Sequence, residues 1–432
     1  MSISNEKYKI CVIGLGYVGL PLTIEFAKFF CTFGYDLSVK RVNELNQKFD
    51  RYGLVKKKNF NTKHSLKFSN DPNILKYSNF IIVTVPTPVT STNIPDFSYL
   101  KKACLEIGNH IKKNSIVVFE STVYPGATRE ICIPIIEKVA KFKLGKDFFV
   151  GYSPERISIG DNTYNLKNIV KIISADSNKS RKIIKKVYSK ILDKKPYEAE
   201  SIEVAEFAKV FENTQRDLNI SLVNELSIIS NKLGISSDSV IKAATTKWNF
   251  MKFTPGLVGG HCISVDPYYL AYKSKKIGYQ TKVINAGRHV NNAMPHFIYN
   301  NIKNRLIKSK KKLEKLKIIV LGLTFKENCK DIRNSKIFDL IKILDKKKFK
   351  VFLHDPYAIK EEVKEMYNKE MIKFNKLPKS DVIILSLNHK FYLRIGLKKI
   401  ISKLNKKGIF VDLKSTFKSS FAHTIDEKYF CL

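Results

Sequence analysis

One cysteine and one aspartate stand close together in a glycine-rich stretch of this sequence. Residues 256–270 read GLVGGHCISVDPYYL, so Cys262 follows Gly259 and Gly260 and lies four residues before Asp266. Glycine lets a backbone bend sharply or lets another group come close. Cys262 could therefore be a nucleophile, a metal ligand or a small buried residue in a tight turn, and the stretch alone does not separate these readings.

A lysine and an asparagine lie four residues apart in the longest predicted helix. Apolar residues recur at helical spacing from Glu198 to Gly234, and Lys209 and Asn213 share one face of that helix. An ammonium and an amide that look into a site can together stabilise an oxyanion. The alternative is an ordinary pair on an exposed face.

Further polar candidates follow predicted strands, where an α/β sheet meets its ligands. Glu155 in GYSPERISIGD could be a general base or a solvated loop carboxylate. Thr122 in ESTVYPGAT could cap the next helix, or could face a cofactor or a water. Pro86 and Thr87 in VTVPTP could contact a ligand or only end the strand.

Gly14, Gly16 and Gly19 form a GxGxxG motif between a predicted strand and a predicted helix. This context is that of a dinucleotide site, where the helix N-terminus receives the pyrophosphate. Asp36 ends the next strand and could bind both ribose hydroxyls, which favours NAD over NADP, although Lys40 and Arg41 nearby weaken that preference. The residues predicted to bind the cofactor are Gly14, Gly16, Tyr17, Val18, Gly19, Asp36, Arg41, Pro86, Thr87 and Thr122.

The stretch LKIIVLGLTF (316–325) repeats the order of strand and glycine seen at the N-terminus, and GLTFKENCKDIRNSK (322–336) is the region after its strand. Lys326 and Arg333 lie in its loop and could hold a second phosphate group, or could belong to a charged surface loop.

The elements around these residues predict an α/β protein with two doubly wound, Rossmann-like domains joined by a central helical region that contains a long helix. Strands alternate with helices in the first and last parts of the chain, and a parallel sheet is expected in the first. The predicted domains are 1–198, 199–307 and 308–432.

The chain has 432 residues and a formal net charge of +38. Such a charge can indicate nucleic-acid binding, but the lysines are spread along the chain and no known nucleic-acid motif occurs. No apolar run is long enough to cross a membrane, and no signal core precedes the first strand, so a cytoplasmic protein is expected. The seven cysteines form no CxxC pair, and no metal site is predicted.

Taken in order, the motifs resemble those of the UDP-glucose/GDP-mannose dehydrogenase family, from about Lys9 to about Lys414. The resemblance implies an NAD-dependent, four-electron oxidation of a primary alcohol to a carboxylate. It implies that the cysteine attacks an aldehyde, with thiohemiacetal and thioester intermediates. The catalytic residues that it implies are Cys262, Lys209, Asn213, Asp266, Glu155 and Thr122, and the substrate-binding residues are Glu155, Arg156, Lys209, Asn213, Gly259, Lys326 and Arg333.

One branch of the family fits best. TKWNFMKFTPGLVGGHC and SPERISIGD are similar to the dehydrogenases of UDP-N-acetylglucosamine or UDP-N-acetylgalactosamine, and Ile159 stands where UDP-glucose enzymes usually have a second glutamate. The resemblance implies a homodimer that serves surface polysaccharide synthesis. UDP-glucose oxidation and a non-catalytic nucleotide-sugar or nucleic-acid binding protein are the alternatives.

Overall fold

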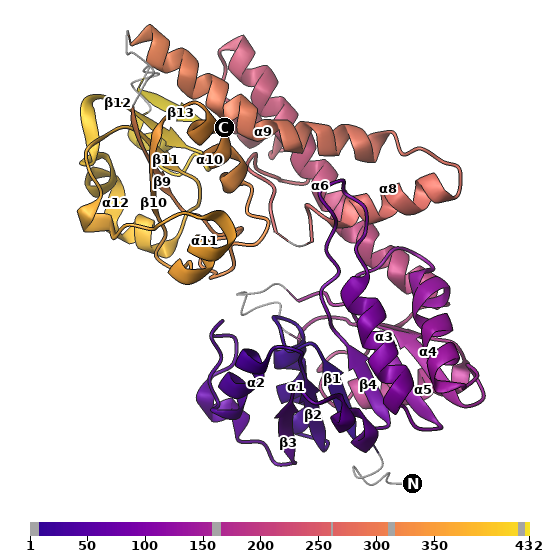
Figure 1. Ribbon diagram of the computed structural model, residues 1–432. Helices are drawn as coiled ribbons and strands as arrows, with labels where there is room; N and C mark the ends of the chain where they lie inside the picture. Colours follow the sequence, from indigo (N-terminus) through magenta and orange to yellow (C-terminus); the bar gives the residue numbers. More distant parts are fainter. Residues whose placement is uncertain (1–7, 158–165, 261, 310–315, 422–427) are drawn as a thin grey trace. The chain divides into compact units, whose positions relative to one another are not determined.

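The computed structural model divides the chain into two compact units, which are described separately below (Figure 1). The first unit comprises Met1–Glu212 and Tyr268–Tyr279, and the second comprises Asn213–Pro267 and Gln280–Leu432. The structure describes residues 8–157, 166–260, 262–309, 316–421 and 428–432. The inference drawn from Ile159 falls outside these residues.

The first unit is built on an eight-stranded sheet in the order β3-β2-β1-β4-β5-β6-β7-β8. The order reverses between β1 and β4, and this switch point is where doubly wound sheets bind their ligands. The expectation of a parallel sheet is wrong at one place, because β7 runs antiparallel to β6. The strands are β1 (Ile10–Ile13), β2 (Thr32–Tyr35), β3 (Leu66–Ser69), β4 (Phe80–Val83), β5 (Ser115–Phe119), β6 (Phe148–Tyr152), β7 (Ile172–Ala175) and β8 (Tyr197–Glu198).

Alternate side chains of the central strands form a buried layer under two helices. Ile10, Val12, Phe80 and Ile82 pack with residues of α1 (Gly19–Ala27) and α5 (Asn178–Tyr188). These strands are apolar at every position, as expected for strands covered on both faces. The remaining helices of this part are α2 (Val39–Asn46), α3 (Ser98–His110) and α4 (Ile133–Ala140).

The helix predicted between Glu198 and Gly234 is α6 (Ile202–Leu233), and it belongs to both units. The boundary falls between Glu212 and Asn213, so Lys209 lies in the first unit and Asn213 in the second. The other helices of the central region are α7 (Ser237–Ala244), α8 (Asp266–Lys276) and α9 (Val283–Lys308).

The second unit contains a five-stranded parallel sheet in the order β10-β9-β11-β12-β13, the flavodoxin-like form of a doubly wound sheet. Residues of α9 and α10 (Ile337–Lys346) pack on one face, and residues of α12 (Lys390–Ile401) pack on the other. The predicted fold class is thus confirmed. The strands are β9 (Lys317–Leu321), β10 (Lys350–His354), β11 (Ser380–Leu385), β12 (Leu404–Asp412) and β13 (Tyr429–Cys431), and α11 covers Lys360–Tyr367.

Within the described residues, no helix is both long and apolar enough to span a membrane.

Candidate active site

The GxGxxG turn has the geometry that a dinucleotide needs. Gly14 has a φ of +91°, which a residue with a side chain rarely adopts. A Cβ on Gly19 would lie 1.8 Å from the carbonyl oxygen of Gly14, so α1 can approach the turn only without one. A Cβ on Gly16 would meet no protein atom within 4 Å. The backbone at Gly16 is therefore open to the close approach of another group.

Asp36 lies beside this turn, at the end of β2. Its Oδ2 accepts a hydrogen bond from the Leu15 amide at 2.8 Å. The buried Arg41 donates its Nε to the Leu15 carbonyl at 2.9 Å, and its guanidinium lies 2.9 Å from a carboxylate oxygen of Asp50. The charge of Arg41 is balanced by that of Asp50. The carboxylate of Asp36 is therefore the charge that a ribose at the end of this strand would meet.

We expect Asp36→Asn to narrow the preference for NAD over NADP, because it keeps an acceptor for the Leu15 amide and removes the charge. Two like charges about 4 Å apart near a protein surface repel by roughly 1 to 4 kcal/mol, so a change of about tenfold or more is expected. The measurement is kcat/KM for each cofactor in both proteins. Equal rates with NAD and NADP in the unmodified chain would contradict the placement of Asp36 on the ribose.

The loops after β1, β4 and β5 are joined by hydroxyl groups. Thr84 Oγ1 donates to the Gly14 carbonyl at 2.7 Å, and Thr87 Oγ1 donates to the Thr122 carbonyl at 2.7 Å. The hydroxyl of Tyr269 on α8 also donates to the Thr87 carbonyl, at 2.6 Å. The structure thus brings Thr87 and Thr122 together at the carboxyl edge of the sheet, on the same side as the glycine turn.

In the first unit, α6 presents two buried polar side chains to loops that carry candidate residues. Lys209 Nζ donates to the Glu155 carbonyl, and both residues are buried. Glu206, one turn earlier and fully buried, accepts from the amides of Gly126 and Thr128 in the loop after β5. Burial raises the pKa of Glu206 to about 7. Sequence reasoning missed Glu206, although it precedes Lys209 by three residues and Asn213 by seven and so shares their helix face.

Arg156, a predicted substrate-binding residue, makes contacts within the protein. Its Nε and Nη2 donate to the two carboxylate oxygens of Glu212 on α6 at 3.2 and 2.6 Å, and its Nη1 donates to the Val170 carbonyl at 2.8 Å. In this structure Arg156 ties the loop after β6 to α6.

In the second unit, α6 contacts the segment that holds the cysteine. Asn213 Nδ2 donates to Asp266 Oδ2 at 2.6 Å, and both side chains are buried. The carbonyl of Cys262 accepts from the amides of Val265 and Asp266, so the cysteine lies in the turn that enters α8. Its side chain is exposed, whereas Cys11, Cys104, Cys132 and Cys329 are buried. Exposure argues against the reading of Cys262 as a small buried residue.

The metal-ligand reading of Cys262 has no support in the part of the chain that the structure describes. No group of three or more His, Cys, Asp or Glu side chains there could hold a metal ion. The seven cysteines, all within the described ranges, form no disulfide. Cys262 is therefore an exposed thiol in the turn that precedes α8.

The glycine-rich segment before Cys262 is fixed at both of its ends. Asn224 of α6 is fully buried, and its amide group pairs with the N–H and C=O of Gly256 at 2.8 and 3.1 Å. Gly260, with a φ of +89°, donates its amide to the Asn334 carbonyl at 3.1 Å, and a Cβ on Gly259 would lie 2.7 Å from the same oxygen. The two motifs GLVGGHC and GLTFKENCKDIRNSK therefore pack against each other.

A lysine that sequence reasoning did not select lies at this segment. Lys414 follows β12, and its Nζ would lie 2.7 Å from a Cβ on Gly256. Burial lowers the pKa of Lys414. Its position two residues after the strand segment IFVD (409–412) was the signal that could have identified it.

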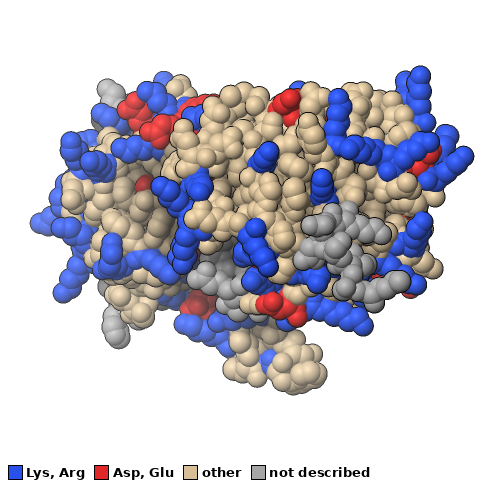
Figure 2. Space-filling view, turned by 90° about the horizontal axis from the view of Figure 1, so that it is seen from below, with Lys and Arg blue, Asp and Glu red and all other residues tan. Residues whose placement is uncertain are grey.

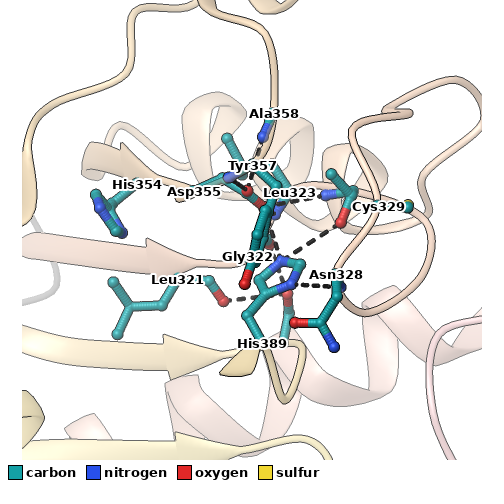
Figure 3. A network of polar contacts seen from close by, with 12 residues as sticks. Leu321, Gly322, Leu323, Asn328, Cys329, His354, Asp355, Tyr357, Ala358 and His389 are labelled. Atoms are coloured by element: carbon teal, nitrogen blue, oxygen red, sulfur yellow. Dashed lines mark hydrogen bonds and ion pairs between the residues drawn. The ribbon is translucent and has the colours of Figure 1, made fainter. Parts of the chain in front are cut away.

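The loop that carries Lys326 and Arg333 is held from within the second unit (Figure 3). The Asn328 amide donates to Nδ1 of the buried His389, so the ring proton is on Nε2, which lies 3.0 Å from Asp355 Oδ2. Arg333 donates to both carboxylate oxygens of Asp331, at 2.9 and 2.7 Å. This pair orients the guanidinium at the edge of the loop.

Asp355 ends the second strand of its sheet in sequence order, as Asp36 does in the first unit, yet its surroundings differ. Its carboxylate accepts from the amides of Leu323, Tyr357 and Ala358. Burial alone would raise the pKa of Asp355, but the hydrogen bonds from His389 and these amides lower it. A buried carboxylate with its acceptors used in this way cannot bind ribose hydroxyls, so the second sheet lacks the dinucleotide site of the first.

The positive charge does not gather in one place on the face that Figure 2 shows. Lys and Arg side chains are scattered over it, with Asp and Glu side chains between them. Scattered lysines are typical of a solvated surface rather than of a nucleic-acid binding stripe.

Three family models match the chain. They are the NAD binding domain, the central domain and the UDP binding domain of the UDP-glucose/GDP-mannose dehydrogenase family, over residues 8–192, 203–293 and 319–419. A Salmonella typhi protein named UDP-N-acetyl-D-glucosamine 6-dehydrogenase is 44% identical, with 95% of this chain and 96% of that protein covered. A Pseudomonas aeruginosa protein of the same name is 41% identical, with 95% and 97% covered.

Solved structures agree with this result. The structure of a UDP-D-ManNAc dehydrogenase from Pyrococcus horikoshii matches with a TM-score of 0.85 and 28% identity, and 94% of each chain is covered. The matches extend over both units and over the N-terminal domain that binds NAD. The chain belongs to the UDP-glucose/GDP-mannose dehydrogenase family of NAD-dependent oxidoreductases.

Proposed function

We propose that this chain oxidises the C6 hydroxyl of a UDP-N-acetylhexosamine, UDP-N-acetylglucosamine or UDP-N-acetylgalactosamine, to the uronic acid with two NAD. The observation that carries the proposal is the exposed Cys262 in the turn before α8, four residues before an Asp266 that is hydrogen-bonded to Asn213. The two relatives above are named for UDP-N-acetyl-D-glucosamine, which makes this sugar the first to test. UDP-glucose is the alternative substrate.

In the proposed mechanism, NAD, when bound at the Gly14 turn, supplies a hydride acceptor at each of two oxidations. Thr122 and Asp266 hold a water that takes the proton of the C6 hydroxyl. The Cys262 thiolate then attacks the aldehyde carbon and gives a thiohemiacetal, whose oxyanion Lys209 and Asn213 stabilise.

Loss of the second hydride from that carbon leaves a thioester on Cys262. A water activated by Glu155 or Asp266 attacks the thioester, releases the carboxylate and regenerates the thiol. Because the carbon stays bound to sulfur between the two oxidations, the reactive aldehyde does not escape.

The test is a panel of UDP-sugars with NADH absorbance and product mass as readouts. The proposal expects two NADH per sugar and a product heavier by one oxygen and lighter by two hydrogens. One NADH per sugar would indicate an ordinary two-electron dehydrogenase. No turnover of any UDP-sugar, with binding retained, would favour the non-catalytic alternative.

A homodimer and a role in surface polysaccharide synthesis are part of the same proposal. Large apolar side chains are exposed on the long helix, which supports a partner that covers them, and sedimentation velocity would measure the mass in solution. These exposed residues of α6 are Val204, Phe207, Phe211, Leu222, Ile229 and Leu233.

We expect Arg333→Lys to weaken UDP-sugar binding by about 1 to 3 kcal/mol, the loss typical of a charged hydrogen bond, because lysine cannot reproduce the fork that Asp331 orients. NADH binding, which we assign to the first unit, should not change. Two calorimetric titrations of the variant, one with UDP-sugar and one with NADH, measure both. An equal loss for the two ligands would show that the assignment of one ligand to each sheet is wrong.

A further inference from the structure

A lysine with no solvent exposure lies behind Glu155. Lys171 directly precedes β7, and its side chain is fully buried. Its ammonium donates to Glu120 Oε2 at 2.8 Å and to the Pro154 carbonyl at 3.3 Å, and it lies 3.8 Å from Glu155 Oε2. A buried cation is costly unless it is paired, and here the Lys171 ammonium lies near two carboxylates.

The antiparallel pair in the first sheet explains why these three groups meet. The register of β5 and β6 pairs Phe119 with Tyr152, and that of β6 and β7 pairs Tyr152 with Ser174. Glu120 directly follows β5, and Glu155 comes three residues after the end of β6. Lys171 directly precedes β7, which runs the other way, so all three reach the same edge of the sheet. A fully parallel sheet would have put the residue before β7 at the opposite edge.

The two carboxylates differ in what else they contact. Glu120 also accepts from the Tyr188 hydroxyl, and burial raises the pKa of Glu120 despite the nearby Lys171. Glu155 accepts the amides of Arg156 and Ile157 on Oε1. Its buried Oε2 has no hydrogen-bond partner among the described residues. Among the described residues, the cation that forms an ion pair with that oxygen is Lys171, at 3.8 Å.

The other charged or titratable groups nearby are engaged elsewhere. Lys209 on α6 donates to the Glu155 carbonyl rather than to its carboxylate. The Arg156 guanidinium binds Glu212, also on α6. The Tyr188 hydroxyl on α5 is directed to Glu120.

We propose that Lys171 is a positioning residue for Glu155. It holds the Glu155 peptide through the Pro154 carbonyl and attracts the unsatisfied Oε2, so that Glu155 is presented as an aligned carboxylate able to take a proton from water. This inference rests on the proposed role of Glu155 in releasing the product.

Two variants test the inference without leaving Lys171 or Glu120 as an unpaired buried charge. In Glu120→Gln, Glu155 is the one carboxylate of the two that still faces the Lys171 ammonium. The double variant Lys171→Met with Glu120→Gln removes both the ammonium and the Glu120 carboxylate. The matched control is Lys185→Met, which removes from α5 a lysine that forms an ion pair with Glu198 of β8. Thermal unfolding of each protein establishes that it is folded.

The readout is the pH dependence of carboxylate release in single turnover. An opposite charge within about 4 to 6 Å changes the titration of a carboxylate by roughly 1 to 3 pH units. We expect the acidic limb of the double variant to lie about one pH unit or more above that of Glu120→Gln, with the KM for NAD unchanged. Glu120→Gln should move the limb below that of the unmodified chain, which tests the inference even if the double variant does not fold. Coincident limbs in all folded variants would overturn it.

A second readout needs no substrate, so it separates this inference from the proposed function. In protein labelled with 13C-glutamate, the Glu155 carboxyl signal is identified by its loss in Glu155→Gln. The inference expects this signal to titrate at higher pH in the double variant than in Glu120→Gln. Identical titrations would overturn it, whether or not the unmodified chain oxidises a UDP-sugar.

Discussion

Cys262→Ser is expected to abolish the formation of carboxylate. A serine hydroxyl stays protonated near neutral pH, whereas a thiol is intrinsically more acidic and more nucleophilic, and that of Cys262 is exposed. Serine is therefore the poorer nucleophile toward the aldehyde, and an oxygen ester is the poorer acyl donor to water. The second oxidation requires the covalent adduct, so at most one NADH per sugar should form. Loss of a catalytic nucleophile lowers kcat by about 10⁴-fold or more.

The measurement is NADH stoichiometry together with the mass of the sugar product. Cys31→Ser is a suitable control, because this half-buried cysteine lies beside β2 in the first unit and has no proposed role. It should keep two NADH per sugar. If Cys262→Ser also released two NADH per sugar, the cysteine could not be the nucleophile and the proposed mechanism would fail.

Much of the fold could be predicted because its signals are local. The strand ending at Ile13, the glycines that follow it and the acidic residue at the end of β2 are close in sequence, and each has one structural meaning in that order. The long helix and the second glycine turn at Gly322 were likewise visible as periodicity and spacing.

The direction of β7 was not visible, because an isolated apolar run has no orientation. The residues 158–165 between β6 and β7 lie outside the described ranges, and their sequence has no helical pattern that would require a parallel return. Since this direction brings Lys171 to Glu155, the buried ion pairs of that edge were also beyond prediction.

The sequence could indicate which residues belong to the candidate site, but not how buried each one is or which groups it contacts. Cys262, Asn213 and Asp266 could be selected from motifs, but exposure of the thiol and the contact between the amide and the carboxylate depend on tertiary packing. Glu206 and Lys414 were missed for the same reason, because a charged residue in a helix or after a strand is most often solvated.

The equivalence of Asp36 and Asp355 shows how one fold comes to hold two different ligands. Both end the second strand of their sheet, and both accept the amide that follows a glycine with positive φ, Gly14 or Gly322. Only Asp36 retains acceptor capacity toward solvent. In the second unit, Thr324 takes the place of the second glycine of the motif, so the bare backbone that Gly16 offers to a dinucleotide is not repeated there.

A pair of glycine substitutions is expected to separate folding from cofactor binding in the first unit. In Gly16→Ala the new Cβ would meet no protein atom within 4 Å, so thermal stability should not change. The methyl group would occupy the space that the pyrophosphate needs, and overpacking of about 1 to 3 kcal/mol corresponds to roughly 5- to 150-fold weaker NADH binding.

Gly19→Ala should act on folding itself. Its Cβ would lie 1.8 Å from the Gly14 carbonyl oxygen and 2.4 Å from Thr84 Oγ1, and the carbonyl is backbone that cannot turn aside. We expect a loss of about 3 kcal/mol or more in the stability of the first unit, since α1 must move away from β1. Thermal unfolding and NADH titration of both variants provide the comparison. Unchanged NADH binding by Gly16→Ala would mean that the dinucleotide does not lie against this turn, because the structure offers no other reason for that position to lack a side chain.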